Sequence, residues 1–149
     1  MAATGTASTV EHAFAASVSQ IEPVASWVSQ ACKGLKVSED AIGRLDICVN
    51  EVLANILSHG GSGALAAPIR MQLCVEQGLE DGAATLTISD SGVPFDATRC
   101  AVRPAAGTLA DAQPGGLWVI MLRANADDLL YSYHEGENRL EITVRWQSP

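Results

Sequence analysis

The stretch of residues 45–60 constrains the fold more than any other part of the chain, because a polar row is set into an apolar helix pattern. Its apolar residues recur every three or four positions: Leu45, Cys48, Val49, Val52, Leu53, Ile56 and Leu57. Glu51, Asn55 and His59 follow one another at four-residue steps and would share another face. A carboxylate and an amide beside apolar surface cost free energy unless each has a partner. The row is therefore expected to line a cavity for a polar ligand, such as a metal bound to phosphate.

Length and composition favour a single soluble domain. The chain has 149 residues, of which 48% are hydrophobic, enough for one core. We expect one domain over residues 1–149, with residues 1–8 disordered. The formal net charge of -8 argues against binding to a nucleic-acid backbone, which needs basic patches. No apolar run approaches the roughly 20 residues of a membrane helix, so we expect a cytoplasmic protein without direct nucleic-acid or membrane contacts.

The cysteines are expected to be reduced packing residues, because they show none of the paired spacings of zinc or redox sites. They are Cys32, Cys48, Cys74 and Cys100.

The first half of the chain predicts a strand and two helices. A strand is expected over residues 9–19, and a helix follows over residues 23–35, with Gly34 near its end. Ser38 has a typical N-cap side chain and precedes the long helix with the polar row. The glycine-rich residues 60–63 are expected to end that helix and to begin a loose connection.

The second half predicts four strands, a short helix and a long irregular segment. Residues 69–76 and 84–90 are typical of an antiparallel hairpin. Residues 91–114 lose all periodicity, and such a segment in a small domain is usually a functional lid or disordered. An apolar helix is expected over residues 117–124. The last two strands are expected over residues 128–134 and 139–146.

Three polar or glycine-rich points interrupt these apolar elements. They are Glu51 with Asn55 on the long helix, Asp90-Ser91-Gly92 at a strand end, and Gly115-Gly116 at a helix start. Each alone has an ordinary explanation: a solvated helix face, a turn, or a flexible hinge. Together they fit one ligand better than three unrelated features.

That ligand is a nucleotide with its metal. Asp90 can accept a hydrogen bond from an exocyclic amine such as that of adenine, and Gly92 lets the backbone approach a flat ring. A glycine pair at a helix start exposes backbone N–H groups to phosphate. Asn55 can bind a magnesium ion that bridges phosphates, and Glu51 is then a candidate general base.

In this order and spacing, the motifs resemble those of the bacterial anti-sigma factor serine/threonine kinases of partner-switching systems. The motifs are Glu51-x-x-x-Asn55, Asp90-x-Gly92-x-Pro94-Phe95-Asp96, Gly115-Gly116-Leu117, Asp127-Asp128, Tyr133 and Gly136-x-Asn138-x-Leu140. The resemblance implies the Bergerat ATP-binding fold, shared with histidine kinases. We accordingly expect an α+β two-layer sandwich with a mixed, mostly antiparallel sheet and helices on one face.

The resemblance also implies roles for these residues. Asn55 would coordinate Mg²⁺, and Glu51 would activate the substrate hydroxyl. Asp90 would bind the adenine amino group, with Gly92 beside the ring. The remaining nucleotide-binding residues would be Gly115, Gly116 and Leu117 at the phosphates and Asn138, where relatives often have a threonine that binds adenine through water.

The implied activity is ATP-dependent phosphorylation of a serine or threonine on a small anti-anti-sigma protein of the STAS type. The unphosphorylated partner would compete with a sigma factor for this chain. Relatives commonly pair through the sheet edge near the first strand, so the resemblance also implies a homodimer.

One departure from the family pattern supports an alternative function. Relatives commonly have Gly-Gly-Leu-Gly-Leu where this chain has Gly115-Gly116-Leu117-Trp118-Val119. If the third glycine allows close approach to a phosphate, Trp118 must swing away or partly fill the pocket. The alternative is therefore a non-catalytic module that binds a sigma factor or regulator and has a degraded nucleotide site.

A third reading, a detached histidine-kinase catalytic domain, is less favoured because no dimerisation helix with an acceptor histidine precedes Glu51. His59 is expected to interact with the dipole at the end of its helix. The remaining apolar residues near the motifs are expected in the core: Trp27, Phe95, Leu117, Ile120 and Met121.

Overall fold

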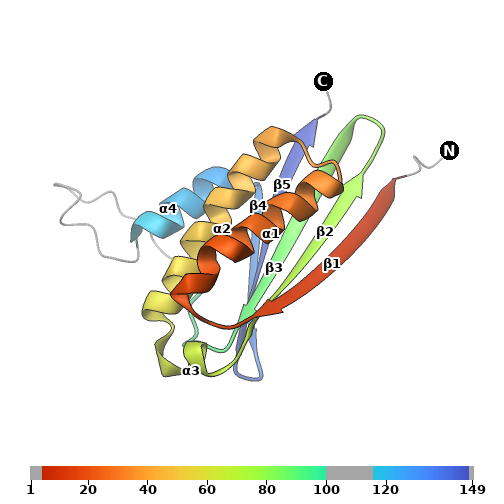
Figure 1. The fold of residues 1–149 in the computed structure, drawn as a ribbon. Coiled ribbons are helices and arrows are strands. Elements are labelled where there is room, and N and C mark those ends of the chain that lie inside the picture. The colour runs from red at the N-terminus through yellow and green to blue at the C-terminus, as the bar shows by residue number, and fades with distance from the viewer. Residues whose placement is uncertain (1–4, 100–115, 148–149) are drawn as a thin grey trace.

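A five-stranded sheet forms one layer, and the helices cover one of its faces (Figure 1). The structure, a computed structural model, describes residues 5–99 and 116–147. The elements in chain order are β1 (Thr6–Phe14), η1 (Val18–Gln20), α1 (Ile21–Gly34), α2 (Glu39–His59), α3 (Gly61–Ala66), β2 (Ile69–Gln77), β3 (Asp81–Asp90), α4 (Gly116–Asn125), β4 (Asp128–His134) and β5 (Glu137–Gln147). No helix in these two described ranges is long and apolar enough to cross a membrane.

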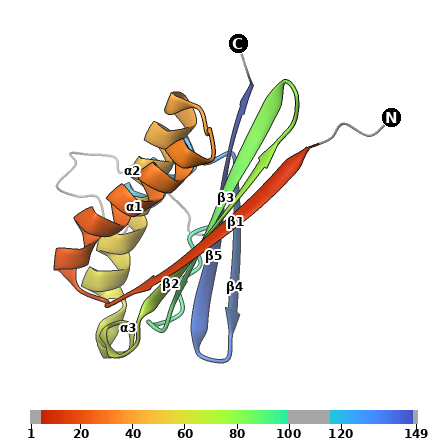
Figure 2. The ribbon, with the colours of Figure 1, turned by 45° about the vertical axis from the view of Figure 1, so that its right-hand side comes forward.

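The sheet has the strand order β1-β2-β3-β5-β4, and each neighbouring pair is antiparallel. Leu73 of β2 lies opposite Leu86 of β3, which lies opposite Ile142 of β5, and all three are fully buried. Figure 2 shows α1 and α2 packed over one face of the sheet. The core therefore lies between one helical layer and one strand layer, as the α+β two-layer class requires.

The long helix α2 forms as its sequence predicts. The Ser38 hydroxyl accepts a hydrogen bond from Ala41 N at 3.2 Å, and two acidic residues in the first turn favour the positive end of the helix dipole. The helix ends at His59, directly before Gly60. Its apolar stripe is buried, with Leu45, Val49 and Leu53 at 0% exposure.

Three expectations about the fold need correction. The first strand covers Thr6–Phe14 instead of residues 9–19, so residues 6–8 belong to a strand and were wrongly expected to be disordered. Residues 18–20 form the short helix η1. Its residues are mostly exposed and the strand is held by backbone pairing to β2, which hydrophobic alternation does not reveal. The connection after Gly60 contains the short helix α3 instead of a loose loop. In the described residues the sheet contains no parallel pair, so it is not mixed.

Arg44 ties the N-terminal half of α2 to the far side of the fold. Its guanidinium donates to Asp40 at 3.1 Å, to Asp127 before β4 at 3.0 Å and to the Arg145 carbonyl of β5 at 2.5 Å. Burial of Asp127 acts to raise its pKa, but hydrogen bonds from Arg145 N and from Arg44 outweigh this and lower the pKa. The ion pair thus fixes α2 against the sheet.

We expect Arg44→Ala to lower the free energy of unfolding by about 1–3 kcal/mol at pH 7, because hydrogen bonds to charged groups are lost. Since the folded-state pKa of Asp127 is lowered, its contribution is present above the ordinary aspartate pKa and is lost as the pH falls through the folded value. The loss caused by Arg44→Ala should therefore shrink on acidification. Urea denaturation at pH 7 and pH 3 measures this.

Arg139→Ala is the matched control, because Arg139 is exposed and makes no side-chain hydrogen bond within the described part of the chain. Equal stability of the Arg44 and Arg139 variants would contradict the role given to Arg44.

Candidate functional site

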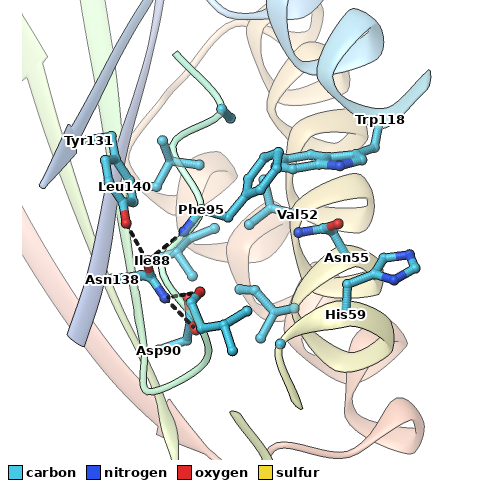
Figure 3. A pocket seen from close by; sticks show the side chains of 14 residues that line it. Val52, Asn55, His59, Ile88, Asp90, Phe95, Trp118, Tyr131, Asn138 and Leu140 are labelled. Carbon is cyan, nitrogen blue, oxygen red and sulfur yellow. Dashed lines mark hydrogen bonds between the residues drawn. The ribbon is translucent and has the colours of Figure 1, made fainter. Parts of the chain in front are cut away.

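A cavity of about 310 Å³ lies between α2 and the sheet (Figure 3). One wall belongs to α2, and β3, β4 and β5 form the other. Of the predicted polar row, Asn55 and His59 line the cavity, whereas Glu51 is half-buried one turn earlier and does not. The lining residues are Val52, Asn55, Ile56, His59, Gly60, Ile88, Asp90, Val93, Phe95, Ala97, Trp118, Tyr131, Asn138 and Leu140.

Asp90 places a carboxylate in the sheet wall at the end of β3. It is 7% exposed, and its Oδ1 accepts hydrogen bonds from Gly92 N at 2.8 Å and from Asn138 Nδ2 at 3.3 Å. Oδ2 has no hydrogen bond within the described residues and can accept one from a ligand. Burial raises the pKa of Asp90 above its ordinary value, in spite of these two hydrogen bonds, and the charge of Glu137 adds to the increase.

Asn138 holds the segment that follows Asp90. Its Nδ2 also donates to the carbonyls of Gly92 at 3.1 Å and Val93 at 3.0 Å. Its Oδ1 accepts from Tyr131 Oη at 2.5 Å and from Phe95 N at 3.3 Å. The amide is therefore committed to protein partners. The contact of Asn138 with adenine stays a prediction. Its role in positioning the segment after β3 does not follow from the sequence, because Tyr131 lies next to it only through the pairing of β4 with β5.

Gly92 lets the segment after β3 pass close to the end of α2. A Cβ at this position would lie 2.9 Å from the Gly60 carbonyl oxygen and 2.8 Å from Asp90 Oδ1. Val93 N donates to the same Gly60 carbonyl at 3.0 Å. The structure thus shows Gly92 packed against Gly60 and not among the cavity-lining residues. A glycine is required here because backbone occupies the space of a side chain.

The glycine motif before α4 is described only in part. Gly115 and most of the segment expected as a lid lie outside the described residues. Gly116 begins α4, and Leu117 is 52% exposed and does not line the cavity. Three residues that were expected in the core are exposed instead: Leu117, Ile120 at 44% and Phe95 at 41%. Leu117 and Ile120 belong to α4, and Phe95 lines the cavity.

Trp118 forms part of the cavity wall. It is 8% exposed, and its ring centroid lies 5.5 Å from that of Phe95 at an interplanar angle of 45°. Its indole Nε1 is buried and has no hydrogen-bond partner within the described residues. Figure 3 shows the two rings side by side above Asn55.

The donor set near the cavity suits magnesium carried by a phosphate ligand. Within residues 5–99 and 116–147, no three His, Cys, Asp or Glu side chains are placed to hold a metal ion. Mg²⁺ commonly takes only one or two protein ligands and completes its shell with phosphate and water. Asn55 can supply an amide oxygen of this kind from α2.

Comparisons with known proteins agree with this geometry. Residues 14–146 match the model of the histidine kinase-like ATPase domain. The chain is 34% identical over 99 residues to the serine/threonine-protein kinase BtrW of Bordetella bronchiseptica. This match covers 66% of this chain and 67% of BtrW.

A solved structure shares the fold. The RsbU and RsbW domains of Rv1364c from Mycobacterium tuberculosis superpose with a TM-score of 0.65 at 12% identity. The match covers 95% of this chain and 33% of that one, so this chain spans about a third of its length. At such low identity the likeness concerns the fold alone.

We expect Asp90→Asn to raise the free energy of unfolding at neutral pH, because a buried charge is removed while one oxygen can still accept both hydrogen bonds. The raised folded-state pKa means that ionised Asp90 opposes folding above that pKa and has no such effect below the unfolded value. The gain should therefore grow as the pH rises through the folded-state pKa. Urea denaturation between acidic and neutral pH measures it.

Asp46→Asn is a matched control on the exposed face of α2 and should show no such trend. A gain for Asp90→Asn that shrinks with rising pH would contradict the assignment.

Proposed function

The chain belongs to the histidine kinase-like ATPase domains, among the bacterial anti-sigma factor serine/threonine kinases, and on this premise we propose that it is an active ATP-dependent protein kinase. Its substrate would be a serine or threonine of an anti-anti-sigma protein of the STAS type. When that protein is phosphorylated, the chain would be free to sequester a sigma factor. ATP and both partners belong to the cytoplasm, where we place the activity.

The observation that carries this proposal is the order of groups along α2. The C-terminal end of the helix, at Gly60, lies beside the segment that follows Asp90, since Val93 N donates to the Gly60 carbonyl. Asn55 lies about one turn back, and Glu51 lies about 6 Å further along the axis. A base bound at Asp90 would direct its phosphates past Asn55 toward Glu51.

Each residue then has a separate task. The free Oδ2 of Asp90 accepts the exocyclic amine of adenine. Asn55 holds Mg²⁺, which neutralises charge on the phosphates. Glu51 takes the proton of the substrate hydroxyl as its oxygen bonds to the γ-phosphorus, the bond to the β–γ bridging oxygen breaks, and ADP leaves. Because Glu51 acts on the substrate hydroxyl at the terminal phosphate, it need not line the cavity that would hold the adenine ring.

The partner surface is supported by coarser observations. The net charge of -8 is compatible with a basic protein partner. β1 is an edge strand whose residues are mostly exposed, which suits the homodimer that relatives form through this edge.

A second function is favoured by Trp118. Its buried indole lines the cavity where relatives have a glycine, so the chain could bind its partners without nucleotide turnover. Under this alternative, wild type gives no heat with ATP in isothermal titration, and Trp118→Gly restores binding. Micromolar ATP binding by wild type would remove its motivation.

For the kinase, we expect Glu51→Gln to reduce phosphate transfer to a cognate STAS-domain protein by about 100-fold or more, because a general base is lost. ATP affinity should stay within about twofold, since Glu51 lies outside the cavity. Transfer of ³²P from ATP with Mg²⁺ measures the rate, and isothermal titration measures the affinity.

Glu39→Gln is the matched control, because Glu39 is exposed in the first turn of the same helix. Phosphate transfer by Glu51→Gln at the wild-type rate would rule out Glu51 as the base. No transfer by wild type to a partner shown to bind it would rule out the kinase.

A further inference from the structure

Residues 93–98 form one wall of the cavity, and we call them the wall segment. Val93, Phe95 and Ala97 line the cavity, and Ala97 is only 1% exposed. The first half of the wall segment is held to the sheet, since Phe95 N donates to Asn138 Oδ1 at 3.3 Å. The second half, at Ala97, lies beyond this contact and depends on another one.

Arg123 of α4 makes that second contact. Its Nη2 donates to the carbonyls of Ala97 at 2.9 Å and Thr98 at 3.1 Å. Among the described residues, these are the hydrogen bonds that join Ala97 and Thr98 to another element, because the remaining bonds of Thr98 go to Asp96 in the same turn. Arg123 is exposed and does not line the cavity, so it can act on the cavity only through the wall segment.

α4 can hold the wall segment in place because α4 is itself packed on α2. Val119 and Leu122 are fully buried, and Cys48 Sγ of α2 donates to the Leu122 carbonyl at 3.9 Å. Arg123 follows Leu122, so its guanidinium links the helical layer to the wall segment. The distance between these two sides determines how thick a ligand the cavity accepts. A cavity of about 310 Å³ is at the small end of the range for ligand pockets, so a small displacement of Ala97 would change its fit to a flat ring.

We propose that Arg123 is a positioning residue for the nucleotide base. It holds Ala97 at the cavity and thereby fixes the width of the space that Asp90 also lines, without touching the ligand. A guanidinium suits this task because it stays charged and presents several donors in a rigid plane. This inference rests on the proposed function, since it requires that a nucleotide occupies the cavity.

The test measures the affinity of Arg123→Ala for adenosine and for ATP with Mg²⁺ by isothermal titration. Both affinities should fall about fivefold, as for the loss of one typical hydrogen bond, because the space for the base is disturbed and no phosphate contact is removed. Arg123→Lys keeps a charged donor and should bind adenosine more tightly than Arg123→Ala does. Without ligand, hydrogen exchange at Phe95 N should be faster in Arg123→Ala than in wild type, because the wall segment opens more often.

Gln77→Ala is the matched control. Gln77 Nε2 also donates to two successive backbone carbonyls, those of Leu35 at 2.9 Å and Lys36 at 2.8 Å, and Gln77 does not line the cavity. This variant should lose stability but keep its affinity for adenosine within about twofold. Equal losses of adenosine affinity in Gln77→Ala and Arg123→Ala would overturn the inference, because the affinity would then follow general stability.

Two further results would overturn the inference and leave the kinase proposal standing. Unchanged affinities in Arg123→Ala would show that the cavity does not depend on Arg123. A loss of affinity for ATP alone would show that Arg123 acts on the phosphates and not on the space for the base. If wild type binds neither adenosine nor ATP, the proposed function falls, and this inference falls with it.

Discussion

The buried carboxylate of Asp90 is the constraint on which the rest of the site depends. It is held at the end of β3 because Gly92 N and Asn138 share its Oδ1, and Asn138 is in turn fixed by Tyr131. This arrangement leaves Oδ2 of this cavity-lining residue without a partner in the described residues, and burial of the charge, which raises the pKa of Asp90, costs stability. Retention of a destabilising charge in this place is what a ligand-binding group requires.

The second organising element is α2, whose helical rise separates functions along one axis. Its end at Gly60 meets the segment beyond Asp90, Asn55 faces the cavity, and Glu51 lies beyond it. A helix keeps such spacing without support from loops, so recognition of the base and the proposed chemistry on the terminal phosphate need no shared residues. The family assignment supplies the roles proposed for Asn55 and Glu51, and the spacing along α2 is compatible with them.

The helices α1, α2 and α4 and the β2–β3 hairpin could be predicted from the sequence, because periodicity and caps are local signals. Asn55 and Asp90 were expected at one site, and both line the cavity, but their roles stay predictions. β1 could not be placed correctly, since an exposed edge strand is specified by its partner and not by its own pattern. The positioning role of Asn138 and the packing of Gly92 on Gly60 depend on contacts between distant segments. Leu117 was misjudged because α4 exposes the face that its apolar sequence suggested would be buried.

The two anchors of α2 have a consequence for how the molecule adapts to its ligands. Arg44 fastens the helix to β5 near one end, and the Gly60 carbonyl fastens it to Val93 at the other. Contacts near both ends of α2 restrict its movement relative to the sheet, so the part of the cavity wall that α2 forms is preorganised. If a nucleotide binds as proposed, its heterocycle would lie against this fixed half of the site, so we expect discrimination between different heterocycles to be strict.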